Sequence, residues 1–149
     1  MQNKILATAN VFLDTSYAIA LSSIQDRFHE KALYLAEEIE ATSVKLITTQ
    51  AIFLEIGNAL SSIKYRQQAG LLLKALETDG SIEVIPLTDF LYEQAFQLFN
   101  KHTDKAWGMT DCISFVVMRE RGLTEALTAD HHFEQAGFRA LLRQPFISS

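Results

Sequence analysis

The chain has 149 residues, of which 48% are hydrophobic, so we expect a single domain over residues 1–149 with a well-buried core. Its 13 basic and 18 acidic residues give a formal net charge of −5, which argues against a protein that binds nucleic acid through charge attraction alone. A nucleic-acid substrate is not excluded, because bound metal ions change the local sign of the charge.

The first part of the chain predicts two strands, each followed by a helix. Val11–Leu13 is an apolar run typical of a buried strand, and apolar residues at helical spacing then predict a helix over Asp26–Ala41. The β-branched segment Val44–Thr48 predicts a second strand. Thr48 or Thr49 is the expected cap of the next helix, which we expect to end near Lys64. Its predicted core face consists of Ile52, Ile56, Ala59 and Ile63.

The middle of the chain predicts a helix, a strand and a second helix. The first helix should cover Gln67–Thr78, with Gly80 as its stop signal. Ile82–Leu87 predicts a third strand, and Thr88 is the expected cap of the helix that follows. The predicted apolar side of that helix consists of Leu91, Ala95, Leu98 and Phe99.

The last third of the chain continues the alternation. Thr110 is the expected cap of a helix that runs to Arg121 and is ended by Gly122. Leu123–Ala129 should contain a strand, the segment HHFEQAG predicts a short turn of helix, and Phe138–Leu142 predicts a last strand.

Alternating strands and helices predict an α/β fold. We expect a parallel sheet of about five strands with helices on both faces, a three-layer, Rossmann-like α/β/α arrangement. Ligands of such sheets bind beyond the carboxyl ends of the strands. Acidic residues at those ends are therefore candidates for a functional site.

Four acidic residues meet this condition. Asp14 ends the first strand, Asp130 ends the strand in LTAD, Asp111 opens a helix, and Glu55 lies on the helix after the second strand. Each also has an ordinary structural explanation: an Asx turn for Asp14, a dipole partner for Asp111, a helix cap for Asp130 and a solvent-facing position for Glu55. The predicted topology nevertheless brings the three aspartates to one edge, with Glu55 within reach.

Carboxylates gathered in this way repel one another. A close pair at about 4 Å costs on the order of 4 kcal/mol at an effective dielectric constant of about 20. A hard divalent cation such as Mg²⁺ or Mn²⁺ offsets this cost, since these ions prefer oxygen ligands. The hydroxyls of Thr15, Ser16 and Thr110 are then the expected supporting groups that orient the carboxylates.

The four acidic residues lie in segments that resemble a known family. FLDTS, TTQAIFLEIGNAL, WGMTDCISFVVM and LTADHHF are similar, in this order, to the four signature blocks of the PIN-domain family, above all its VapC-type toxins. The resemblance implies a metal-dependent endoribonuclease that cleaves RNA phosphodiester bonds with metal-activated water, as the toxin of a toxin–antitoxin pair. It also implies an antitoxin protein as partner and a homodimer.

The resemblance assigns catalytic and metal-binding roles by position. Asp14, Glu55, Asp111 and Asp130 match the family's acidic residues and would hold Mg²⁺ or Mn²⁺. Asp104, just before the third block, is either a fifth member of the site or a solvated loop residue.

Other functions remain open from the sequence. One alternative is a non-catalytic PIN-like module that binds RNA or a protein. A dehalogenase-like phosphatase is less well supported, because its second aspartate would stand where this chain has Ser16. A zinc site is not expected, because His131 and His132 are adjacent and therefore poorly spaced on a helix. Trp107 either packs beneath its loop or stacks on an RNA base.

The same sequence indicates the compartment. The only cysteine, Cys112, cannot form a disulfide within the chain, and we expect it to be a core residue. The first ten residues, MQNKILATAN, are a poor match to a signal peptide, and no apolar run is long enough to cross a membrane. We therefore expect a cytoplasmic protein.

Overall fold

The computed structural model describes residues 5–145, which form a five-stranded, fully parallel sheet in the order β3-β2-β1-β4-β5. The strands are β1 (Asn10–Leu13), β2 (Lys45–Thr49), β3 (Ile82–Ile85), β4 (Glu125–Leu127) and β5 (Arg139–Ala140). The α-helices are α1 (Thr15–Ser22), α2 (His29–Thr42), α3 (Gln50–Ala59), α4 (Arg66–Thr78), α5 (Asp89–Lys101), α6 (Met109–Glu120) and α7 (His131–Gln135). A 3₁₀ turn, Leu141–Arg143, follows β5.

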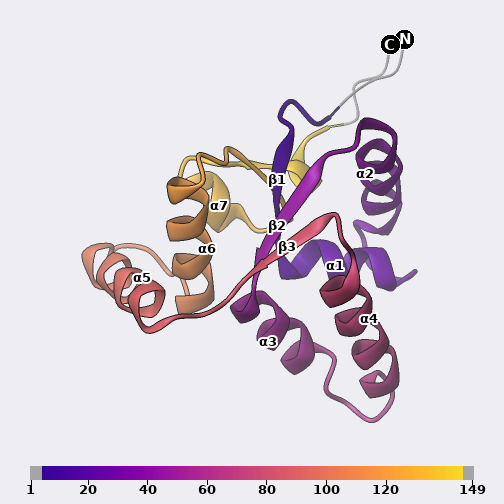
Figure 1. Cartoon of the computed structure of the whole chain (residues 1–149), viewed down its shortest axis with the longest axis horizontal. Coiled ribbons are helices and arrows are strands. Elements are labelled where there is room, and N and C mark those ends of the chain that lie inside the picture. The colour runs from indigo at the N-terminus through magenta and orange to yellow at the C-terminus, as the bar shows by residue number, and fades with distance from the viewer. Residues whose placement is uncertain (1–4, 146–149) are drawn as a thin grey trace.

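The layers match the predicted α/β/α arrangement. Figure 1 shows α5, α6 and α7 on one side of the sheet and α1, α2 and α4 on the other. The central strand β1 pairs with β2 and β4, and Val11, Phe12 and Leu13 are all buried. A strand covered on both faces needs a continuous apolar run of this kind rather than an alternating one. The buried apolar residues of the described chain join into a core cluster that spans the sheet and its helices.

The parallel strands bring several chain turns to one edge of the sheet. In Figure 1 α1 and α3 begin at the lower ends of β1 and β2, which are the carboxyl ends of those strands. The expected caps are present at two helices: the Thr49 hydroxyl accepts from the Ile52 amide at 3.2 Å, and the Thr88 hydroxyl accepts from the Leu91 amide at 3.1 Å. These side chains satisfy amides that have no partner within a helix.

Helix α1 was not among the predicted elements. Its sequence, TSYAIALS, has apolar residues on nearly all sides, so no amphipathic stripe marks it. It is buried between neighbouring elements, with Tyr17, Ala18 and Ala20 in the core. Because none of its residues is fully exposed, the helix lacks the polar face that normally indicates one in a sequence.

The prediction that the following long helix runs to Lys64 was wrong. Helix α3 ends at Ala59, and the chain then turns through hydrogen bonds from the Tyr65 and Arg66 amides to the Ser62 carbonyl. Of the predicted core face, Ile52 and Ile56 are buried, whereas Ala59 is exposed and Ile63 is 95% exposed. The two serines at 61 and 62 favour this turn over a further helical turn.

Three smaller differences concern a helix cap, one predicted core residue and the length of the last strand. Thr110 does not cap α6, since the helix begins at Met109 with Gly108 at its N-cap. Phe99 is 41% exposed and lies outside the core that Leu91, Ala95 and Leu98 enter. The last strand is shorter than predicted, because the chain passes into the 3₁₀ turn after Ala140.

Among residues 5–145, no helix has the length and apolar character needed to cross a membrane.

Candidate active site

Asp14 occupies the junction between β1 and α1. Its amide donates to the Leu127 carbonyl at 3.2 Å, which holds the end of β1 beside the end of β4. Its side-chain Oδ2 accepts hydrogen bonds from the Thr128 hydroxyl at 2.7 Å and the Ser16 hydroxyl at 3.1 Å. The residue is only 6% exposed. Two hydroxyl donors do not fully offset the free-energy cost of burying the negative charge of this carboxylate.

Burial raises the pKa of Asp14 from 3.8 to about 7. Removal from water is the largest cause, and the negative charge of Glu55 raises the pKa further. The hydrogen bonds from Thr128, the Thr15 amide and Ser16 lower it in part. The carboxyl is therefore about half ionised near neutral pH, which a neighbouring cation would shift toward full ionisation.

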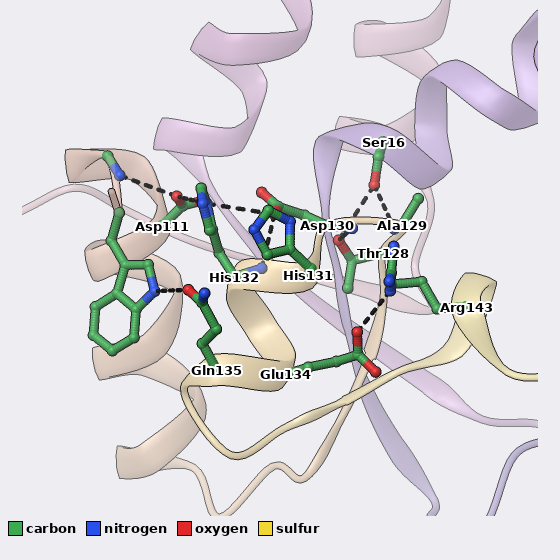
Figure 2. Close-up of polar contacts among 12 residues, drawn as sticks. Ser16, Asp111, Thr128, Ala129, Asp130, His131, His132, Glu134, Gln135 and Arg143 are labelled. Atoms are coloured by element: carbon green, nitrogen blue, oxygen red, sulfur yellow. Dashed lines mark hydrogen bonds and ion pairs between the residues drawn. The ribbon is translucent and has the colours of Figure 1, made fainter. Parts of the chain in front are cut away.

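Thr128 links two of the acidic residues. Its hydroxyl donates to Asp14 and accepts from the Asp130 amide at 3.0 Å. Ser16 makes a parallel link, since its hydroxyl donates to Asp14 and accepts from the Ala129 amide at 2.9 Å. These bonds, part of which Figure 2 shows, fix the loop after β4 against the start of α1. Sequence reasoning included Ser16 and missed Thr128, although a hydroxyl two residues before a strand-end aspartate was a usable signal.

Asp111 faces the same region from α6. Its Oδ2 accepts from the Gly108 amide at 3.0 Å and lies 3.1 Å from His132 Nδ1. Burial raises the pKa of Asp111, and the nearby charge of Asp130 raises it further, whereas the Gly108 and His132 contacts lower it. Burial is the largest cause of the raised pKa of Asp111, and repulsion by Asp130 is a smaller one.

Asp130 begins α7 and lies beside two histidines. Its Oδ1 accepts from the His132 amide at 2.9 Å, so the carboxylate caps this short helix. This is the helix-cap role that the sequence offered as the ordinary structural explanation of Asp130. The same oxygen lies 3.4 Å from His132 Nδ1 and 3.7 Å from His131 Nδ1. Figure 2 shows both rings next to Asp130, with Asp111 on the far side of His132. Although adjacent positions were expected to be poorly spaced for one metal, both Nδ1 atoms turn toward the same Asp130 oxygen.

The remaining predicted residues differ in their relation to this cluster. Glu55 is partly buried on α3, and its effect on Asp14 shows that its charge is felt there. Thr15 is buried, and its hydroxyl has no hydrogen-bond partner among the described residues.

Thr110 and Asp104 are not joined to the carboxylates by any of the contacts described above. The Thr110 carbonyl accepts from the Ser114 hydroxyl at 3.0 Å. Asp104 is exposed and pairs with Lys105 at 3.0 Å, a contact that lowers the pKa of Asp104. This geometry favours the solvated-loop interpretation of Asp104.

Trp107 belongs to the core beside the cluster. It is 5% exposed, its indole nitrogen donates to Gln135 Oε1 at 3.0 Å, and its ring meets Phe115 edge-on at 5.0 Å. The packing interpretation therefore holds, and stacking on an RNA base would require this ring to leave its site.

The donor set fits a hard divalent cation. Asp14, Asp111, Asp130 and Glu55 offer carboxylate oxygens, and burial raises the pKa of Asp14 and of Asp111, so ionising either carboxyl has a cost that a bound cation would offset. Oxygen-rich, negatively charged sites of this kind suit Mg²⁺, Mn²⁺ and Ca²⁺.

The parallel α/β fold with acidic residues at the ends of its strands agrees with a match to a known family: the chain belongs to the PIN-domain family, whose pattern matches residues 11–139. Among curated relatives, the chain is 27% identical to the 23S rRNA-specific endonuclease VapC20 of Mycobacterium tuberculosis over 128 residues, which cover 86% of this chain and 95% of the relative.

Solved structures agree with this assignment. The crystal structure of M. tuberculosis VapC20, a toxin that cleaves the sarcin–ricin loop, aligns with a TM-score of 0.75 at 26% identity over 86% of this chain and 95% of that one. VapBC2 from Rickettsia felis, bound to a DNA fragment from its promoter, aligns with a TM-score of 0.61 at 17% identity over 88% and 96%. FitAcB from Neisseria gonorrhoeae aligns with a TM-score of 0.60 at 16% identity over 87% and 94%. The last two similarities show the fold alone.

Proposed function

We propose that this protein is a Mg²⁺- or Mn²⁺-dependent endoribonuclease with Asp14, Glu55, Asp111 and Asp130 as its catalytic and metal-binding residues. The observation that carries the proposal is the link from Asp14 through Thr128 to Asp130 at the carboxyl edge of β1 and β4, where burial raises the pKa of Asp14 to about 7. A pKa perturbed by burial and by a neighbouring acidic residue is typical of a functional site.

The chain's own residues would prepare the site for catalysis. The four carboxylates would hold the cation, while Thr128 and Ser16 keep the Asp14 carboxyl in one orientation through their hydroxyls. His132 and the Gly108 amide hold the Asp111 carboxyl from the other side. The chemistry that Mg²⁺ or Mn²⁺ supplies to such a site is activation of water and stabilisation of charge on the leaving oxygen. Binding requires the Asp14 proton to leave, so cation affinity should rise with pH through 7.

The proposed substrate is ribosomal RNA. The similarity to VapC20, a 23S rRNA-specific endonuclease that cleaves the sarcin–ricin loop, supports this choice. The family resemblance further supports a role as the toxin of a toxin–antitoxin pair, with an antitoxin protein as partner, a homodimeric assembly and a cytoplasmic location.

The test is cleavage of 23S rRNA, with bulk tRNA as a second substrate. Purified wild-type protein is assayed with Mg²⁺, with Mn²⁺ and with chelator, beside Asp14→Asn and Asp111→Asn. We expect cleavage only with metal, and a loss of at least about 100-fold in each variant, as for the removal of an essential catalytic group. Full metal-dependent cleavage by Asp14→Asn would refute the mechanism.

Asp104→Asn is the matched control. It removes one carboxylate from the loop before α6, where Asp104 pairs with Lys105. We expect this variant to retain cleavage. If the wild type cleaves neither RNA, with or without metal, the result would instead favour the non-catalytic binding module.

A further inference from the structure

Two imidazole rings lie at the rim of the cluster of acidic residues. The ligand atoms of Asp130, His131 and His132 all lie within 4.8 Å of one another. The two rings are 4.5 Å apart between centroids, and His131 leaves 59% of its side chain exposed. Figure 2 shows both rings on the same side of α7 as the Asp130 carboxylate.

The spacing of these atoms is close to that of ligands around one metal ion. Two ligands that are each about 2.1 Å from a tetrahedral zinc ion are roughly 3.4 Å apart. Asp130 Oδ1 lies 3.4 Å from His132 Nδ1 and 3.7 Å from His131 Nδ1. Asp111 Oδ2 lies 3.1 Å from His132 Nδ1 but does not belong to the group of ligand atoms within 4.8 Å of one another. Small shifts of the Asp130, His131 and His132 side chains would bring their three ligand atoms to one cation.

The other two histidines have ordinary structural surroundings. His29 Nδ1 lies 2.7 Å from the Ala20 carbonyl, and the His102 ring packs 4.8 Å from the ring of Trp107. In contrast, both Nδ1 atoms of the pair turn toward a carboxylate oxygen. The carboxylate itself is held in place, since Asp130 caps α7 through the His132 amide and its own amide donates to Thr128.

We propose that Asp130, His131 and His132 form an imidazole-containing metal site that takes Zn²⁺ or a similar borderline cation in preference to Mg²⁺. Imidazole nitrogen suits zinc and related transition metals, whereas Mg²⁺ prefers oxygen ligands and retains several waters. The inference rests on the proposed function for the role of Asp130 in binding metal, and the zinc site lies beside the Mg²⁺ or Mn²⁺ site rather than in place of it.

The first experiment observes the histidine nitrogens directly. Metal-stripped, ¹⁵N-labelled wild-type protein is titrated with Zn²⁺ at pH 7.5, and two-bond ¹H–¹⁵N spectra follow the four imidazole rings. We expect the Nδ1 signals of His131 and His132 to shift with one equivalent of Zn²⁺, while those of His29 and His102 stay in place. Titration with Mg²⁺ should leave both Nδ1 signals far from their zinc-bound positions, because Mg²⁺ prefers oxygen ligands. Absence of a shift at the pair, or equal shifts at all four rings from adventitious binding only, would overturn the proposal.

The second experiment measures affinity. His131→Ala removes an exposed side chain and should lower Zn²⁺ affinity on the order of 10–100-fold, while Mg²⁺ affinity stays unchanged. His102→Gln is the matched control and should bind Zn²⁺ as the wild type does. Equal Zn²⁺ affinity of His131→Ala and wild type would refute the role of His131.

The two proposals fail separately. Loss of RNA cleavage in Asp14→Asn without a Zn²⁺-induced shift of the histidines would support the nuclease and refute the imidazole site. Shifts of both Nδ1 signals in a protein that cleaves no RNA would do the reverse.

Discussion

Substitution of Asp14 by Asn tests the electrostatic description of the site without any RNA. In the metal-free protein the carboxyl is buried and its pKa is about 7, against 3.8 in its ordinary state. A raised pKa means that the folded state retains its proton more strongly than the unfolded chain. The folded state is therefore not penalised below pH 4, and wild-type stability is lost as pH rises from about 4 through 7. Asn carries no charge, and its amide oxygen can accept from Thr128 and Ser16 as the acid does.

The magnitude follows from the two pKa values. The difference between 3.8 and about 7 corresponds to about 4 kcal/mol, at about 1.4 kcal/mol for each factor of ten. Because Asp14 is 6% exposed, solvent screening reduces this free energy only a little. Local relaxation of the protein around the charged carboxylate reduces it further. We expect Asp14→Asn to exceed the wild type in free energy of unfolding by roughly 2–4 kcal/mol at pH 8, or about 5–15 °C in melting temperature.

The assay is urea unfolding in chelator at half-unit intervals from pH 4 to pH 8.5. The difference between Asp14→Asn and wild type should be near zero at pH 4 and should grow to its full value above pH 7. Asp104→Asn is the control, because Asp104 is exposed and the Lys105 contact lowers its pKa. Its stability difference from the wild type should stay constant over pH 5 to 8. An Asp14→Asn protein that is no more stable than the wild type at pH 8 would refute the reasoning.

Three further predictions concern metal binding and the core. At 100-fold excess over its dissociation constant, Mg²⁺ should stabilise the wild type by about 2.7 kcal/mol, more readily at pH 8 than at pH 6, while Asp111→Asn shows a weaker response in the same melting assay. Glu125→Ala should cost roughly 3–5 kcal/mol in urea unfolding, because this 2%-exposed carboxylate joins a buried ion pair, whereas Glu83→Ala at the surface should cost less than about 1 kcal/mol. Phe133→Ala should cost roughly 3–5 kcal/mol in calorimetry or urea unfolding, and a cost below about 1 kcal/mol would contradict its place in the core.

The sequence patterns were most reliable where one segment decides its own structure. Val11–Leu13 and the strand after α2 are apolar or β-branched runs, and both lie in the sheet within one residue of the predicted ends. Thr49 and Thr88 cap helices as expected, since a cap depends on residues three positions apart. Patterns failed where burial or a turn overrode them, as in α1, which has no exposed face, and at the exposed Ile63 after α3.

The positions of the acidic residues were determined by the sequence itself. Asp14 follows a buried strand and Asp130 follows a second one, and in a parallel sheet the carboxyl ends of the strands share one edge. Local pattern and sheet topology therefore suffice to predict that Asp14 and Asp130 lie at one edge of the sheet. The tertiary structure alone decided which groups surround these acidic residues. Thr128 meets Asp14 across 114 positions of the chain, and His132 meets Asp111 across 21. Such contacts depend on distances between separately folded segments, and the raised pKa of Asp14 depends on its burial, which no local pattern encodes.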